Sequence, residues 1–369
     1  MQDLKVINSS NKQQVESKMP SGDIELHTEE LISFLKEKGG NHVSHLIFLQ
    51  DKEIFWTKNR NVLIAYKQIG NKLIVLGDPI GEESNIKNSI KEFCEYCKSK
   101  GLKPIFYQTS SCYMHYYHES GFRFVKIGEE GIVNLQQFSI EGKQGAKLRT
   151  RLNKFTRNGY SFTVLQPPYS TEQLSGIKQI SDSWLGNQKE KGFSVVSFSE
   201  DYVSRFPLAI LSNSKGTIIA FATLASDYKN TISIDLMRKA AESPHGTMDV
   251  LFIHIFNWVK NNGYKTCSLG MTPLSNVGSC KHSLTTEKII RLAYLYGNSL
   301  YNFKGLREFK NKFTSDWEPK YLAYKKTLLP IAILQLLLLI NFKKNQKNNG
   351  QGKSKYLFPK RREKKVLFE

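Results

Sequence analysis

The sequence predicts an α/β protein built from two domains, each with a mixed sheet. Three observations lead to this class. A chain of 369 residues is long enough for two separate hydrophobic cores. Short apolar segments typical of strands alternate with longer segments of helical periodicity. The order of segments also repeats, because each half has several strands, then a helix, a strand, a helix and a last strand.

The first half follows a polar segment, residues 1–20, in which we expect a loose chain. Its helices are expected where apolar residues recur at helical spacing, at residues 24–38, 84–100 and 112–119. Gly101 is suited to end the second of these helices. Its strands are expected at the apolar segments 45–49, 53–57, 61–69, 72–80, 103–110 and 122–135.

The second half is predicted from the same signals. Its strands are expected at residues 160–168, 217–225, 230–237, 265–273 and 321–326. Its helices are expected at residues 171–188, 247–262 and 285–312. We therefore place a flexible N-terminus at 1–20, a first domain at 21–142, a basic linking helix at 143–159, a second domain at 160–327, and an apolar helix with a polybasic tail at 328–369.

The charge of the chain limits its partners. The formal net charge is +20, which favours a polyanion, either nucleic acid or an anionic membrane surface. The N-terminal residues lack the apolar stretch of a secretory signal, and the five cysteines, an odd number, suit a reducing compartment. We therefore expect a cytoplasmic location.

The apolar segment "LLPIAILQLLLLI" at 328–340 has thirteen residues, whereas a spanning helix needs roughly 20. It is followed by a segment rich in Lys and Arg. An apolar anchor beside basic residues is one pattern for reversible attachment to the inner face of a membrane. The alternative is a helix packed on the second domain with a disordered basic end. The sequence leaves both open.

Asp235 and Arg238 are charges in a segment that otherwise predicts a buried strand. Residues three apart on an extended strand face opposite sides, so the two side chains converge only if the strand ends or bulges near Leu236. The end of a strand before a helix is where α/β folds place ligands. An ordinary salt bridge at the edge of a sheet is the alternative. The loop that follows has one glycine, Gly246, whereas a pyrophosphate cradle for coenzyme A needs several.

Other charged residues are candidates for binding. Glu129 and Glu130, beside Lys126 and two glycines, form either a polar turn or a site for an ammonium group. A phosphate clamp or a solvated helix face is predicted by Lys304, Arg307, Lys310 and Lys312. Phosphate contact without base recognition, or a solvated helix, is predicted by Lys143, Lys147, Arg149, Arg151, Lys154 and Arg157.

We expect no metal site. Cys94-x2-Cys97 and Cys112-x2-His115 have spacings found among zinc ligands, but the first pair lies in a helical pattern and a predicted core strand separates the pairs. The sequence also lacks a Walker loop, a Gly-x-Ser-x-Gly motif and a His-Glu-x-x-His motif.

A set of short motifs, in order over about residues 70–325, resembles the synthase domain of the aminoacyl-phosphatidylglycerol synthases, the multiple peptide resistance factor family. The matching motifs are "LGDPIG" (76–81), "KIGEEGIVNL" (126–135), "LRTRLNKFTRNGYSF" (148–162), "SDSWL" (181–185), "EKGFS" (190–194), "DLMR" (235–238), "GTMDVLF" (246–252), "LGMTPLS" (269–275) and "FKGLREFKNKFTSDWEPKYLAY" (303–324).

The resemblance implies two tandem acetyltransferase-like (GNAT) domains that use no coenzyme A, cofactor or metal. It implies transfer of an amino acid, lysine or alanine, from aminoacyl-tRNA to a glycerol hydroxyl of phosphatidylglycerol. Such transfer lowers the negative charge of a membrane and gives resistance to cationic antimicrobial peptides. The implicated residues are Lys126, Glu129, Asp235, Arg238 and Lys310. The family's long N-terminal transmembrane part has no counterpart here, so we expect no lipid translocation.

The expected reaction is a transesterification of an activated ester. Asp235 or Glu129 would hold the α-ammonium group, while Arg238 and Lys310 would bind a phosphate of the lipid or of the tRNA end. The base stays open, and the vicinal hydroxyl of the tRNA is one candidate. Three alternatives remain: a tRNA-dependent transferase that builds peptidoglycan bridges, an inactive scaffold that binds RNA or membrane, and a coenzyme A acyltransferase.

Overall fold

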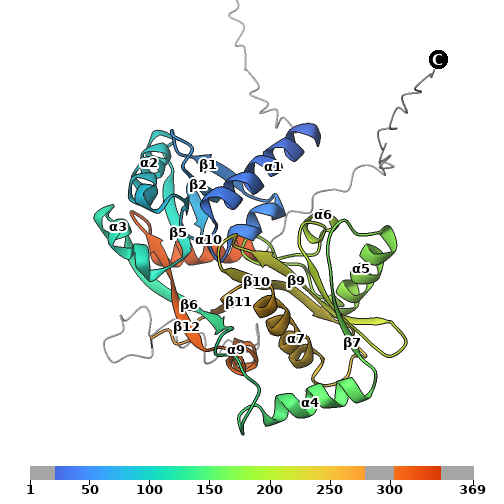
Figure 1. Cartoon of the computed structure of the whole chain (residues 1–369). Helices are drawn as coiled ribbons and strands as arrows, with labels where there is room; N and C mark the ends of the chain where they lie inside the picture. The colour runs from blue at the N-terminus through green and yellow to red at the C-terminus, as the bar shows by residue number, and fades with distance from the viewer. Residues whose placement is uncertain (1–20, 279–302, 342–369) are drawn as a thin grey trace, which may run out of the picture.

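The computed structural model describes residues 21–278 and 303–341, and Figure 1 shows their arrangement. One mixed sheet of twelve strands runs through both halves, in the order β1-β2-β3-β5-β12-β6-β11-β10-β9-β8-β7, with β4 paired to β2. The strands from the first half are β1 (Glu53–Trp56), β2 (Val62–Ile69), β3 (Lys72–Leu76), β4 (Ile80–Gly81), β5 (Lys103–Thr109) and β6 (Arg123–Asn134). Those from the second half are β7 (Ser161–Leu165), β8 (Leu208–Ser212), β9 (Ile218–Ser226), β10 (Thr231–Lys239), β11 (Thr266–Pro273) and β12 (Asp316–Tyr324).

Helices cover both faces of this sheet. The α-helices are α1 (Ser21–Lys38), α2 (Ile86–Ser99), α3 (Met114–Glu119), α4 (Ala146–Arg157), α5 (Thr171–Leu185), α6 (Glu200–Val203), α7 (Thr247–Asn261), α9 (Phe303–Asn311) and α10 (Leu329–Asn341). Short 3-10 helices are η1 (Ser44–Leu49), η2 (Glu83–Asn85) and η3 (Ser111–Tyr113). The predicted α/β class with a mixed sheet is confirmed.

The two halves repeat one topology and exchange their last strands. In each half an antiparallel pair is followed by a helix and a parallel strand: β3 pairs with β5 after α2, and β10 pairs with β11 after α7. The last strand of each half crosses to the other half. There β12 pairs antiparallel with β5, and β6 pairs antiparallel with β11. β6 and β12 also pair with each other over nine positions from Asp316 to Tyr324. One continuous sheet crosses the boundary between the two predicted domains. The sheet therefore does not mark where one domain ends and the other begins, and the predicted boundaries stay a prediction.

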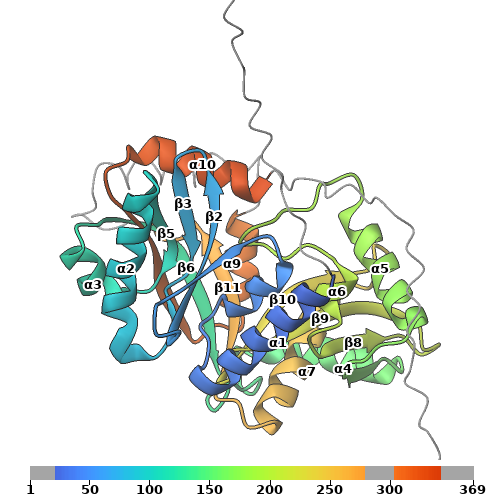
Figure 2. The same ribbon diagram turned by 90° about the horizontal axis from the view of Figure 1, so that it is seen from above.

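Three hydrophobic cores hold the helices on the sheet, and Figure 2 shows these helices from above. One core lies under α2 and α3 on one face of the first half. Another lies on the opposite face, under α1, η1 and α10, and continues under α5 and α6 of the second half. The third lies under α4, α7 and α9. The helix α7 is apolar on most sides because the sheet, α4 and α9 all pack against it.

Several predicted elements differ from the structure. Residues 45–49, predicted as a strand, form the 3-10 helix η1 instead. The apolar run is buried as a strand would be, but the turn before it bends the chain: Asn41 N donates to Ser44 Oγ at 2.6 Å and Val43 N donates to Asn41 Oδ1 at 3.1 Å. The strand β8 and the helix α6 were not predicted. Of the helix predicted at 285–312, residues 285–302 lie outside the described residues.

Candidate active site at the centre of the sheet

An opening between β10 and β11 is the first feature of the site. These two strands run parallel and pair from Thr231 to Ser233 with Thr266 to Ser268. Both strands continue beyond this pairing, β10 alongside β9 and β11 alongside β6, so they diverge. In α/β sheets, ligands bind at the carboxyl ends of strands where neighbouring strands part.

A bulge in β10 brings Asp235 and Arg238 to one face of the sheet. The register of β10 against β9 shifts between Ile234 and Met237. Ile234 and Met237 pack into the core under α7, whereas Leu236 packs into the core under α5 and α6. The contacts of Asp235 and Arg238, described next, lie on this second face. The sequence predicted that Asp235 and Arg238 converge only if the strand ends or bulges near Leu236, and the structure has a bulge there.

Asp235 anchors a small polar group at the opening. His45 Nε2, from η1, lies 2.8 Å from Asp235 Oδ2. The hydroxyl of Tyr202, from α6, donates to the same oxygen at 3.1 Å. Burial and the Asp235 carboxylate raise the pKa of Tyr202 well above its ordinary value, so this phenol stays a donor. Asp235 keeps 22% of its side-chain surface exposed, so its carboxylate also faces open space.

Arg238 is buried and fully engaged by this chain. One nitrogen of its guanidinium, Nη2, lies 2.8 Å from each of the two carboxylate oxygens of Glu190. It also donates to the hydroxyl and the carbonyl of Ser181 on α5 and lies over the ring of Trp184. Only 3% of Arg238 is exposed. The contacts tie β10 to α5 and to the loop that carries Glu190.

Lys310 reaches the opening from α9. Its ammonium donates to the carbonyl oxygens of Gly270 at 2.9 Å and Met271 at 3.2 Å, where the pairing of β11 with β6 is irregular. Burial lowers the pKa of Lys310 to about 8, although Glu130 and Asp235 act in the opposite direction. At neutral pH this group is therefore a cation that can release its proton more easily than an exposed lysine.

Glu129 is surrounded by cations of this chain. It lies 2.6 Å from the ammonium of Lys126 and 2.6 Å from the guanidinium of Arg307, and it accepts a hydrogen bond from Asn276 at 3.0 Å. Burial alone would raise its pKa, but hydrogen bonds and charge from Lys126 and Arg307 lower it. The predicted role of Glu129 as a holder of an ammonium group stays a prediction, and its carboxylate already has two positive partners.

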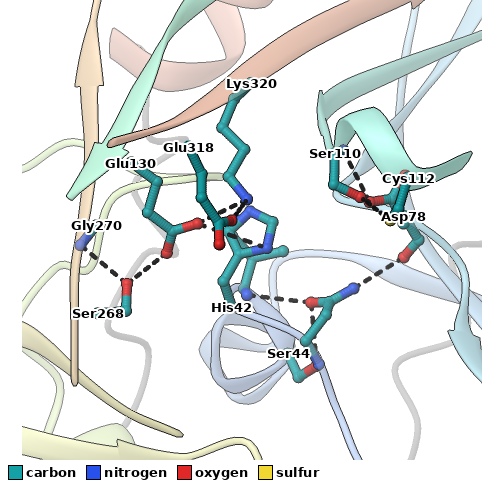
Figure 3. Close-up of polar contacts among 12 residues, drawn as sticks. His42, Ser44, Asp78, Ser110, Cys112, Glu130, Ser268, Gly270, Glu318 and Lys320 are labelled. Atoms are coloured by element: carbon teal, nitrogen blue, oxygen red, sulfur yellow. Dashed lines mark hydrogen bonds and ion pairs between the residues drawn. The ribbon is translucent and has the colours of Figure 1, made fainter. Parts of the chain in front are cut away.

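Glu130 and Lys320 form a buried ion pair at the middle of the sheet (Figure 3). The pair is 2.7 Å long, and 1% and 2% of the two side chains are exposed. Ser268 donates to the other oxygen, Glu130 Oε1, while His42 Nδ1 lies 4.0 Å from Glu130 Oε2, the oxygen that pairs with Lys320. Burial would raise the pKa of Glu130, but the fields of His42 and Lys320 and hydrogen bonds from Lys320 and Ser268 lower it to about 2. Burial lowers the pKa of His42 to about 3, so this imidazole is neutral at pH 7 and Lys320 is the counter-ion.

The remaining predicted cations do not reach the opening, although Lys312 and Arg151 meet at Asp249. Lys312 pairs with Asp249 of α7 at 2.9 Å, and Lys304 is exposed. On the linking helix, Arg151 also pairs with Asp249, and Arg149 donates to the carbonyls of Ile140 and Gly142. The exposed cations of that helix are Lys147, Lys154 and Arg157. Their predicted contact with phosphates stays a prediction.

The N-terminus of α7 carries its own anion. Asp249 lies in the first turn of α7, is 3% exposed, and pairs with Arg151 and Lys312. A Cβ atom at Gly246, the residue before α7, would lie 2.9 Å from the side chain of Arg151. A carboxylate stabilises a helix N-terminus and repels a second anion there. This end of the helix is thus already neutralised and closed by side chains.

Sequence reasoning missed the partners of the predicted residues. They are His42, His45, Glu190, Tyr202, Ser268 and Lys320. The signal available for Glu190 and Lys320 was their place in the motifs "EKGFS" and "FKGLREFKNKFTSDWEPKYLAY". His45 gave no signal because residues 45–49 were predicted as a strand, and His42 lies just before that segment in no motif.

Residues 21–278 and 303–341 contain neither a metal-binding cluster nor a membrane-spanning helix. No group of three or more His, Cys, Asp or Glu side chains in these ranges is placed to hold a metal ion. None of the helices in these ranges has the length and apolar character needed to cross a bilayer.

Comparisons with known proteins place the chain in a family. The family described as "Phosphatidylglycerol lysyltransferase, C-terminal" matches residues 32–324. A phosphatidylglycerol lysyltransferase of Bacillus subtilis is 42% identical over 299 residues, which are 81% of this chain and 35% of that protein. One of Staphylococcus aureus is 39% identical over 304 residues, 82% of this chain and 36% of that protein. The chain thus spans about a third of the length of these relatives.

Solved structures agree with this match. The structure of L-PGS from Bacillus licheniformis has a TM-score of 0.77 at 45% identity and covers 85% of this chain and 97% of that one. The C-terminal domain of a putative lysylphosphatidylglycerol synthetase from Agrobacterium fabrum has a TM-score of 0.76 at 31% identity, covering 86% and 97%. FemX, at 10% identity and a TM-score of 0.53, shares the fold alone. The resemblance seen in the motifs is confirmed: the chain belongs to the family of phosphatidylglycerol lysyltransferase C-terminal domains.

Proposed function

We propose that this protein is a transferase that moves a lysyl group from aminoacyl-tRNA to a glycerol hydroxyl of phosphatidylglycerol. The relatives named phosphatidylglycerol lysyltransferase support the lipid acceptor and the lysyl group. An activated ester is the donor that needs no cofactor, and the net charge of +20 suits both a tRNA and an anionic membrane. We also propose that this lysylation, by lowering the negative charge of membrane lipid, contributes to resistance against cationic antimicrobial peptides.

The observation that carries this proposal is the grouping of Asp235, His45 and Lys310 at the opening between β10 and β11. A transesterification requires a proton acceptor and a group that stabilises an oxyanion. His45, held by Asp235 at 2.8 Å, supplies the acceptor. The ammonium of Lys310 has three N–H donors, of which two carbonyls use two. The third can stabilise the oxyanion.

The proposed step conserves atoms and charge. The glycerol oxygen of the lipid attacks the ester carbonyl carbon of lysyl-tRNA, and its proton passes to His45. The carbonyl oxygen becomes an oxyanion beside Lys310. When the oxyanion collapses, the bond to the ribose oxygen breaks and that oxygen takes the proton from His45. The products are a lysyl ester of phosphatidylglycerol and an uncharged tRNA.

Arg238 is proposed here as a positioning residue. Its Nη2 already pairs with both carboxylate oxygens of Glu190, and this pair fixes the loop beside the opening instead of binding a lipid phosphate. The anion at the N-terminus of α7 supports the view that coenzyme A is not used, because that helix end would otherwise receive a pyrophosphate.

A transfer assay tests the proposal. Purified protein is mixed with phosphatidylglycerol vesicles and with tRNA charged separately with labelled lysine or alanine, and the lipid is extracted. Label in the lipid from lysyl-tRNA is the expected result. Label from alanyl-tRNA alone would change the donor, and no label from either would overturn the proposal.

Variants test the site. Asp235→Asn and His45→Gln should each lower the transfer rate at least about 100-fold, because general base catalysis contributes about that much. Asp182→Asn removes an exposed carboxylate of α5 that pairs with Lys178 and is the matched control. If Asp235→Asn transferred at the rate of this control while both stayed folded, the site assignment would be wrong.

A further inference from the structure

A cavity of about 990 Å³ lies far from the candidate active site. It is lined by residues from the starts of β3, β5 and β6 and from the end of β12 onward into α10. Along β6, its residue Arg123 is seven residues from Glu130, which is about 23 Å of extended strand. The cavity is therefore separate from the opening between β10 and β11.

The lining of this cavity is basic. It has no Asp or Glu and carries five cations, Lys72, Lys103, Arg123, Lys325 and Lys326. Within the described part of the chain, none of these five is paired with a carboxylate; Lys72 donates to Asn71, and Lys325 to Ser120 O and Cys94. Burial and the nearby charge of Lys103 lower the pKa of Lys72. A bound anion would relieve this mutual repulsion.

Two polar atoms at the cavity have no partner in the described structure. Thr327 Oγ1 and Gln335 Oε1 are buried and accept or donate no hydrogen bond, and both residues line the cavity. A buried polar atom without a partner is costly, so such atoms mark places where a ligand or water supplies the missing contact. They point to a polar ligand and add to the argument from charge.

The helix α10 forms one wall of this cavity and leaves an apolar face uncovered. One side of α10 packs into the core through Leu329, Ala332, Leu336 and Leu339. On the other side, Leu334 is 58% exposed and Leu337 is 49% exposed, and Ile331 and Leu338 are exposed beside them. No residue of α10 is charged. A helix that is apolar on most sides is normally covered on most sides, and among residues 21–278 and 303–341 this face has no partner.

We propose that the α10 face and the basic cavity together form a docking site for an anionic phospholipid bilayer. The apolar side chains enter the interface between headgroups and acyl chains, and the cavity receives the phosphate of one anionic headgroup. The helix α10 lies in the plane of the membrane, because thirteen residues span only about 20 Å and do not cross it.

Charge selects this occupant over others. A second copy of the chain seated on the same face would bring two clusters of five cations together. A nucleic acid would match the cations but leave the leucines exposed. The sequence after residue 341 contains ten Lys or Arg and two Glu, which adds attraction to an anionic surface. Residues 329–341 lie beyond the family match, whereas Lys72, Lys103 and Arg123 of the cavity lie within it.

Vesicle binding by the full chain tests the proposal. Sedimentation is measured with vesicles of phosphatidylcholine alone and with vesicles in which about a third of the lipid is phosphatidylglycerol. We expect Leu334→Gln/Leu337→Gln and Lys103→Glu/Arg123→Glu each to weaken binding to the anionic vesicles at least tenfold. Lys215→Glu/Lys260→Glu makes the same change of net charge at exposed positions of the second half and should bind within twofold of the parent.

Each other outcome would overturn a part of the proposal. If both double variants bound like the parent, the docking site would be wrong. If the parent bound both kinds of vesicle equally, the headgroup site would be wrong. A dimer in solution that Leu334→Gln/Leu337→Gln dissociates would assign the face to a second copy. The proposal rests on the proposed membrane location but not on the chemistry, because binding is measured without tRNA and a chain without transfer activity can still bind.

Discussion

The buried pair of Glu130 and Lys320 allows a quantitative prediction. At 2.7 Å and an effective dielectric constant of about 20, the attraction is about 6 kcal/mol, most of which offsets the removal of both charges from water. The shift in the pKa of Glu130 from 4.5 to about 2 corresponds to about 3 kcal/mol. We therefore expect Lys320→Met, which leaves a buried carboxylate, to lower the free energy of unfolding by about 3–5 kcal/mol.

A double variant of Glu130 and Lys320 measures how much the two charges depend on each other, apart from their other contacts. Glu130→Gln should cost less than Lys320→Met, because Glu318 lies 3.3 Å from Lys320 and can replace the lost carboxylate. Glu130→Gln/Lys320→Met removes both charges, so its loss should be smaller than the sum of the single losses by at least about 2 kcal/mol. Lys178→Met/Asp182→Asn is the matched control, since that exposed pair is 2.6 Å long and should contribute less than about 1 kcal/mol.

Urea denaturation followed by circular dichroism measures these free energies. The parent should also lose stability as pH falls from about 4.5 to about 2, because the Glu130 carboxylate is ionised in the folded state over that window and protonated in the unfolded state. Additive losses in the double variant would refute the reasoning, since they would mean that the two charges do not depend on each other.

Three further predictions concern Lys310, Glu190 and Gly246. The pKa of Lys310 is about 8 in the folded chain and 10.5 in the unfolded chain, so the unfolded chain binds more protons between these pH values. The free energy of unfolding of the parent, measured relative to Lys310→Met, should therefore rise by about 3 kcal/mol from pH 8 to pH 10.5. A difference between the two proteins that stays constant with pH in urea titrations would contradict this. Glu190→Gln should destabilise by about 1–3 kcal/mol and speed proteolysis of residues 186–199, because it leaves the buried Arg238 without its carboxylate; unchanged cleavage would argue against a role in holding the loop. Gly246→Ala should lower the melting temperature, because φ there is +94°, whereas Gly176→Ala, in open space within α5, should raise it; equal shifts would refute the assignment of strain.

The sequence was sufficient for elements whose pattern is local. The helix α7 was predicted at 247–262 and lies at Thr247–Asn261, because its apolar run is long and its start and end are marked by Gly246 and Gly263. The strand predicted at residues 45–49 was wrong, because a short apolar segment fits a buried 3-10 helix as well as a strand. The exchange of β6 and β12 leaves no local pattern, since pairing depends on segments about 200 residues apart.

The same distinction applies to the candidate site. Asp235 and Arg238 stood out because charges interrupt an apolar strand, and the need for a bulge followed from the two-residue period of a strand. Their partners His45 and Glu190 come from other segments with no periodic signal. The basic cavity was also invisible, because its cations come from the ends of four separate strands.

The exchanged strands also determine when the chain can finish folding during synthesis. Thr109 of β5 contacts Tyr321 of β12, a separation of 212 residues. At about 5–20 residues per second, a ribosome needs about 10–40 s to make that stretch. Until then β5 and β6 have an unpaired edge on the nascent chain, which is the kind of edge that pairs with other chains. Factors that bind nascent chains should therefore affect the yield of this protein more than that of one whose halves close separately.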